Sequence, residues 1–176
     1  MRVLWTGLGI LGLAVLLTSC GKTEAPVYQT PVPKPCIIPT NLPNNAMGKL
    51  GIQVIQIGKN VRIVIPSDNI FKDSRYTELD PKAYPALDDL ASLLKKYPNR
   101  RMIVTGYTDE MGTYRRDAAL SEHQAQSLIT YLWTQGVPHE CLIPIGMGKD
   151  DSGTVSSNRS IDGKADNRRI EITFRA

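Results

Sequence analysis

The fold of this chain is indicated first by one stretch of sequence, which reads Gly106-Tyr107-Thr108-Asp109-Glu110-Met111-Gly112. A short apolar run at residues 102–105 comes directly before it and predicts a buried strand. A segment from about Tyr114 to Gln135 follows, in which apolar side chains recur at helical spacing. The stretch is therefore expected to be a loop that leaves a strand and enters the N-terminus of a helix.

Outward from this loop, alternating apolar and polar residues predict a sheet. The predicted strands are residues 51–57, 61–65, 102–105, 142–145 and 169–174. The strand that contains Pro144 is expected at a sheet edge, because proline cannot donate to a ladder. Asp80-Pro81 predicts the start of a further helix, whose buried face includes Leu87 and Leu94 and which Pro98-Asn99 ends. The order β-β-α-β-α-β-β predicts an α+β fold, a mixed sheet with two main helices packed on one face.

The N-terminus has the features of a targeting segment. A positive start at Met1-Arg2 precedes the apolar run Leu8–Leu17, which is too short to cross a bilayer and has the length of a secretory signal core. The sequence Leu17-Thr18-Ser19-Cys20-Gly21 follows and resembles a bacterial lipobox. That resemblance implies a signal peptide at residues 1–19, acyl chains on Cys20, and sorting to the outer membrane because Gly21 is not aspartate. An ordinary signal, or a short anchor with an incidental cysteine, is the alternative.

Residues 20–46 are interpreted as a proline-rich tether. Six prolines interrupt the segment and apolar periodicity is weak, so it is expected to be extended and not to form a core. At about 3.1 Å per residue, some 25 residues reach on the order of 75 Å. An ordered arm that uses Ile37, Ile38 and Leu42 to lie on the domain or on a partner is the alternative.

Cys36 and Cys141 remain once Cys20 is assigned to the lipid anchor. In an oxidising compartment they either form a disulfide that fixes the tether to the domain or stay as two unpaired thiols. The sequence gives no distance between them, so both states remain open.

The composition narrows the class of protein. The formal net charge of +4 comes without a long run of lysine or arginine, which argues against a nucleic-acid-binding protein. The 2 histidines and 3 cysteines are too scattered to indicate a metal site, so neither a metal nor a cofactor is expected. No nucleophile–base pair stands out, and Ser121 is interpreted as a packing residue on a helix. We therefore expect a binding protein and not an enzyme.

The loop at residues 106–112, the pair Leu120-Ser121 and the segment Asn167-Arg168-Arg169 have the spacing of a known family. Over roughly residues 67–172 the chain resembles the peptidoglycan-binding domain shared by OmpA-like proteins and Pal lipoproteins. This resemblance implies that residues 47–176 form a periplasmic OmpA-like domain. It also implies non-covalent binding of a peptidoglycan stem peptide, which would tether the lipid-anchored outer-membrane protein to the cell wall.

The resemblance also implies the positions of the ligand site. The candidate residues for binding diaminopimelate are Tyr107, Asp109, Asp117, Gln124 and Arg168. Asp109 would accept the ligand's amine. The family motif Leu-Ser-x-x-Arg-Ala has an arginine where this chain has Gln124, its usual asparagine is Asp117, and its common histidine is Tyr107.

These departures predict weaker binding. Gln124 adds no positive charge and Asp117 adds a negative one, so we expect a loss of about 2 kcal/mol, or roughly thirtyfold in affinity. Arg168, Arg115 and Arg116 are the candidates for supplying the missing positive charge.

Structural roles remain open for the same residues. Asp109 either binds the amine or shapes the loop and caps the helix. The segment Asn167-Arg168-Arg169 either contributes to the site or orients the last strand. Tyr107 either lines the pocket or packs at a strand end.

A second function also remains open. The lipobox, the short tether and the changed pocket are similar to those of the small OmpA-like lipoproteins of type IVB (Dot/Icm) secretion systems. This similarity implies a structural subunit of an outer-membrane secretion complex, with envelope secretion proteins as partners and weakened or lost peptidoglycan binding.

Overall fold

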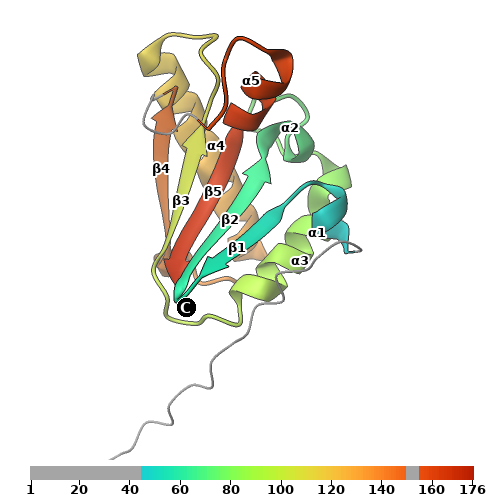
Figure 1. Cartoon of the computed structure of the whole chain (residues 1–176). Helices are drawn as coiled ribbons and strands as arrows, with labels where there is room; N and C mark the ends of the chain where they lie inside the picture. Colours follow the sequence, from blue (N-terminus) through green and yellow to red (C-terminus); the bar gives the residue numbers. More distant parts are fainter. Residues whose placement is uncertain (1–44, 150–154) are drawn as a thin grey trace, which may run out of the picture. The chain divides into compact units, whose positions relative to one another are not determined.

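The computed structural model describes residues 45–149 and 155–176 (Figure 1). The predicted signal peptide, Cys20, Cys36 and the tether up to residue 44 lie outside these residues, so they remain predictions. The first described element is the short helix α1 (Ala46–Lys49), which overlaps the last predicted residue of the tether. Its N-cap is Asn45, whose side chain accepts a 2.9 Å hydrogen bond from the Gly48 N–H.

Five strands form one mixed sheet in the order β1-β2-β5-β3-β4. They are β1 (Gln53–Ile57), β2 (Asn60–Pro66), β3 (Met102–Tyr107), β4 (Leu142–Gly148) and β5 (Arg169–Arg175). Neighbouring strands are antiparallel except β3 and β4, which are parallel. The predicted hairpin is formed by β1 and β2, and the strand with Pro144 is an edge strand, as predicted.

Two long helices, α3 (Tyr84–Leu94) and α4 (Tyr114–Thr134), lie on the same face of the sheet (Figure 1). The predicted arrangement is therefore confirmed. Asp80 caps a 3₁₀ turn that leads into α3, and Thr113 caps α4 by accepting a 3.4 Å hydrogen bond from the Arg116 N–H. In the described part of the chain, no helix is both long and apolar enough to span a bilayer.

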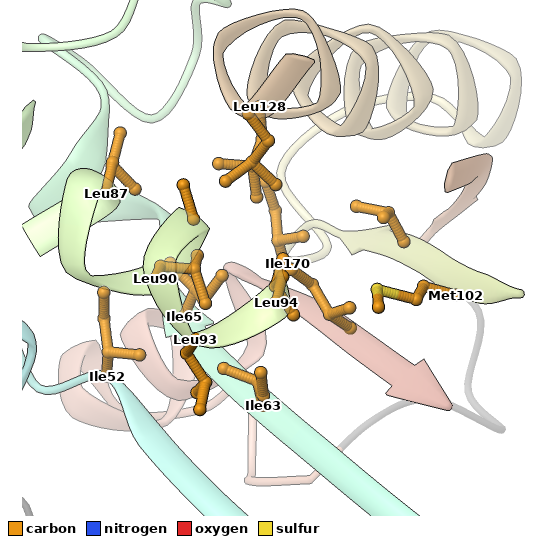
Figure 2. Close-up of a cluster of buried hydrophobic side chains, with 14 of the residues drawn as sticks. Ile52, Ile63, Ile65, Leu87, Leu90, Leu93, Leu94, Met102, Leu128 and Ile170 are labelled. Carbon is orange, nitrogen blue, oxygen red and sulfur yellow. The ribbon is translucent and has the colours of Figure 1, made fainter. Parts of the chain in front are cut away.

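The core lies between this face of the sheet and the helices. Alternate residues of β2 and β5 point into it, because successive side chains of a strand point to opposite faces. Leu87, Leu90 and Leu94 of α3 are three or four residues apart and meet these strands from the other side (Figure 2). Figure 2 shows them together with Ile63, Ile65, Met102, Leu128 and Ile170.

Helix α4 lies unusually close to β3 and β4. A Cβ atom at Gly106 would overlap the backbone carbonyl of Ser121, and one at Gly146 would overlap that of Ala118. Ser121 is fully buried, and its Oγ accepts a 2.9 Å hydrogen bond from the Gly148 N–H. Ser121 is therefore a packing residue, as the sequence predicts, and glycine sets the distance between helix and sheet.

Three short α-helices were not predicted, namely α1, α2 (Ser67–Ile70) and α5 (Ile161–Asn167). The α5 sequence contains a glycine and a single large apolar residue, Ile161, which is exposed. It therefore has no apolar stripe from which a helix could be predicted.

The packing of α4 predicts a stability difference between two truncations. Leu128→Ala removes a fully buried side chain and should lower the free energy of unfolding by about 2–5 kcal/mol. Ile57→Ala removes a side chain that is 75% exposed and should change it by less than about 0.5 kcal/mol. Urea unfolding of both variants measures this, and equal losses would contradict the placement of α4 over the core.

Candidate functional site

The loop between β3 and α4 is shaped by Asp109. Its Oδ1 accepts a 3.1 Å hydrogen bond from the Met111 N–H, two residues ahead, which is the local bond that an aspartate typically makes in a turn. The carboxylate is 13% exposed, so it lies at the wall of the site and not in open solvent. Asp109 therefore has a structural role in the loop, one of the alternatives that the sequence left open.

The same carboxylate is bound by a distant arginine. Arg168 Nη1 donates to Asp109 Oδ2 at 2.6 Å, while its Nε and Nη2 donate to Asp68 at 2.8 and 2.6 Å. These hydrogen bonds raise the pKa of Arg168 above its ordinary value, chiefly through Asp68, so its positive charge is fixed. One guanidinium group therefore faces two carboxylates. The cluster formed by Arg168, Asp68 and Asp109 has a net negative charge.

Asp68 was not among the residues that the sequence predicted for the site. It lies in α2, and strand pairing brings it to Arg168, because Pro66 of β2 is opposite Arg169 of β5. The Ser67 N–H also donates to the Arg168 carbonyl at 3.0 Å. In the sequence, Asp68 is marked only by its position shortly after the predicted strand at residues 61–65. That position does not show that this strand pairs with the last one, which is what brings Asp68 to Arg168.

The three residues Asn167-Arg168-Arg169 have three different roles. Asn167 binds residues 155–158, accepting from the N–H groups of Val155 and Ser156 and donating to Ser156 O and Asn158 Oδ1. Arg168 contributes to the site. Arg169 is buried and donates to Glu171 at 2.6 Å, so this part of the segment orients the last strand.

Tyr107 also has two roles. Its ring lies 4.1 Å from the Arg169 guanidinium carbon, a cation–π contact across the β3–β5 pair. It also lines the pocket above the loop. Tyr107 therefore both packs at a strand end and lines the pocket, the two roles that the sequence left open.

Gln124 is buried in α4 and faces the loop that precedes α3. Its Nε2 donates to the carbonyl of Ser74 at 2.7 Å and to that of Tyr76 at 2.9 Å. A glutamine amide has two N–H donors, and both are used here. Gln124 therefore fixes the wall of the pocket, and in this arrangement it has no N–H left for a ligand carboxylate.

Asp117 is buried beneath the loop and is 5% exposed. The Gly112 N–H donates to its carboxylate, but Oδ2 has no hydrogen-bond partner among the described residues. Burial raises the pKa of Asp117, Lys149 acts in the opposite direction, and Asp109 adds to the increase. The carboxyl group is therefore less easily ionised than an ordinary aspartate.

All five predicted site residues line one pocket of about 440 Å³. They are Tyr107, Asp109, Asp117, Gln124 and Arg168. Arg116 of α4 and Arg75 also line it, whereas Arg115 does not. The pocket thus contains the Asp109 carboxylate, which the Arg168 guanidinium holds in place. This arrangement is able to receive a small ligand that carries an amine.

The remaining candidate chemistry lies away from this pocket. Cys141 is partly buried directly before β4, and Cys36 is outside the described residues, so both the disulfide and the two unpaired thiols remain open. Residues 45–149 and 155–176 contain no group of three side chains able to hold a metal ion.

The buried Asp117 predicts a pH-dependent stability difference. Because its pKa is raised in the folded state, its favourable contribution is present below the unfolded pKa of about 3.9 and is lost as the pH rises through the folded pKa. Asp117→Asn avoids this loss, so the stability of the variant relative to the wild type should increase as the pH rises above the unfolded pKa.

Urea unfolding across this pH range measures the effect, with the exposed Asp89→Asn as the control. A gain that does not change with pH, or an equal gain in the control, would show that burial of the charge is not the cause.

Comparison with known proteins finds relatives that are named as lipoproteins. The chain is 36% identical over 124 residues to the probable lipoprotein YiaD of Escherichia coli K12, covering 70% of this chain and 55% of that protein, so it spans little more than half of that relative. It is 34% identical over 133 residues to the peptidoglycan-associated lipoprotein of Rhizobium meliloti, covering 70% of this chain and 76% of the relative.

A solved structure described as the cell wall anchor of the type VI secretion system of Pseudomonas aeruginosa has the same fold. Its TM-score is 0.62 at 26% identity, over 71% of this chain and 87% of that one. The family model described as the OmpA family matches residues 70–168, which contain the loop, α4 and Arg168. The chain therefore belongs to the OmpA family.

Proposed function

We propose that this protein binds peptidoglycan non-covalently, with the amine of a diaminopimelate residue accepted by Asp109. The observation that carries the proposal is the hydrogen bonding of this carboxylate. Its two oxygens bind Met111 and Arg168, and each oxygen has a second acceptor position. An ammonium group in the pocket can therefore bind Asp109 without displacing either protein partner.

The electrostatics of the cluster favour a cation. Asp68 and Asp109 together outweigh the single charge of Arg168, and the pocket wall limits the access of water to Asp109. A hydrogen bond between charged groups contributes about 1.5–3 kcal/mol, more than a neutral one. The names of the R. meliloti lipoprotein and the P. aeruginosa anchor refer to the cell wall, which supports this choice of ligand.

The cellular role that we propose is a tether. Acyl chains on Cys20 would hold the protein at the periplasmic face of the outer membrane, since burial of each CH₂ contributes about 0.8 kcal/mol. The segment from Cys20 to residue 46 would span the distance to the cell wall. Relatives named as lipoproteins support this role.

The proposal predicts a specific loss of binding. Asp109→Asn keeps the size of the side chain and removes its charge, so the affinity for isolated sacculi should fall about tenfold or more. Asp89→Asn, an exposed change on α3 that does not line the pocket, is the matched control and should bind as the wild type does.

The measurement is sedimentation of the detergent-solubilised full-length protein with purified sacculi, and thermal melts confirm that both variants fold. Undiminished binding by Asp109→Asn would contradict the proposed role of the carboxylate.

A second candidate function is a structural subunit of a type IVB secretion complex in the outer membrane. The observation that favours it is the sheet face opposite α3 and α4. Ile55, Ile57 and Ile103 are exposed there and border a hollow of about 560 Å³. Exposed apolar surface of this kind often marks a protein-binding site.

The two candidate functions predict different results for a double substitution on this sheet face. If the protein acts through partners on this face, Ile57→Lys with Ile103→Lys should abolish co-purification with envelope secretion proteins and leave sacculus binding intact. Ile161→Lys alters an exposed isoleucine on α5 that does not border the hollow, and it serves as control. Unchanged co-purification in the double variant would remove the support for the second candidate.

A further inference from the structure

The pocket lacks a donor where the family motif has its arginine. The amide N–H groups of Gln124 are both bound to backbone carbonyls at residues 74 and 76. A ligand that carries a carboxylate beside its amine therefore needs another cationic partner in this protein.

Two of the nearby guanidinium groups are already engaged. Arg168 donates through Nε, Nη1 and Nη2 to two carboxylates that exceed its charge. Arg75 is held by Asp73 through bonds of 3.0 and 2.7 Å. Neither group offers a ligand carboxylate an uncompensated positive charge.

Arg116 differs from both. Its guanidinium makes no hydrogen bond or ion pair within residues 45–149 and 155–176, although it lines the pocket. Arg116, Leu120 and Gln124 are four residues apart along α4 and line the pocket together, as expected for one face of a helix. Arg116 lies about 12 Å from Gln124 along the helix axis, toward the N-terminus.

The surroundings of Arg116 suit an anion. It belongs to the first turn of α4, where free N–H groups and the helix dipole favour negative charge. The neighbouring Asp117 acts electrostatically with Arg116, but its carboxyl group is buried beneath the loop and accepts the Gly112 N–H. The guanidinium itself remains at the surface, where it can bind a carboxylate through two N–H groups.

We propose that Arg116 binds the carboxylate of the ligand and so replaces the motif arginine that is absent at position 124. The inference rests on the proposed function. The ligand is a zwitterionic amino-acid end, with its ammonium at Asp109 and its carboxylate displaced toward the N-terminus of α4. The pocket therefore discriminates between a free diaminopimelate carboxylate and its amide.

The test varies protein and ligand together. The probes are two synthetic stem tripeptides that end in diaminopimelate, identical except that the side-chain carboxylate of one is a carboxamide. Dissociation constants are measured by calorimetry for the wild type, Arg116→Gln and Arg115→Gln. Arg115 is the matched control, because it is the adjacent exposed arginine and does not line the pocket.

We expect Arg116→Gln to weaken binding of the acid peptide about tenfold and to leave the amide peptide within twofold, because only the acid gains a charge-assisted bond. Arg115→Gln should change neither. Arg116→Lys should recover part of the loss.

The ways in which the test can fail are distinguishable. If the wild type binds the peptides and Arg116→Gln behaves like Arg115→Gln, the role of Arg116 is wrong while the proposed function stands. If Arg116→Gln weakens the binding of both peptides equally, Arg116 does not bind the side-chain carboxylate. If the wild type binds neither peptide, the proposed function and this inference both fail.

Discussion

The bridge from Arg168 to Asp68 and Asp109 is the interaction on which the rest of the site depends. It joins three parts of the fold that are far apart in sequence, namely α2, the loop after β3 and the residue before β5. Loops are normally the most variable parts of a domain, and a loop that binds a ligand needs a fixed geometry. Arg168 provides it by holding the Asp109 carboxylate at one wall of the pocket.

The close contact between α4 and the sheet supports the opposite wall. Glycines at 106 and 146 let the helix backbone approach β3 and β4, and the buried Oγ of Ser121 binds the end of β4. Asp117 and Gln124 are on the same helix, so their positions follow from this contact. A buried polar side chain is costly unless it is hydrogen-bonded. Gln124 meets that condition, whereas Asp117 Oδ2 has no partner within the part of the chain that the structure describes.

The sequence predicted the regular elements well, because their signals are local. Alternation in β1 and β2 and the leucine spacing of α3 each follow from the burial of one face. The site was predicted only in part. The resemblance named five residues that do line one pocket, but the contacts of Arg168 with Asp68 and of Gln124 with residues 74 and 76 depend on tertiary pairing. The choice of Arg116 over Arg115 depends on helix rotation, which is visible only in three dimensions.

A crystal structure of the protein with a bound stem tripeptide ending in diaminopimelate tests the central claim most directly. The account predicts an ammonium nitrogen within hydrogen-bonding distance of an Asp109 oxygen, with Arg168 still bridging Asp68 and Asp109. A ligand bound elsewhere, or a bridge broken to admit the ligand, would contradict the claim that Arg168 holds the site in its binding geometry.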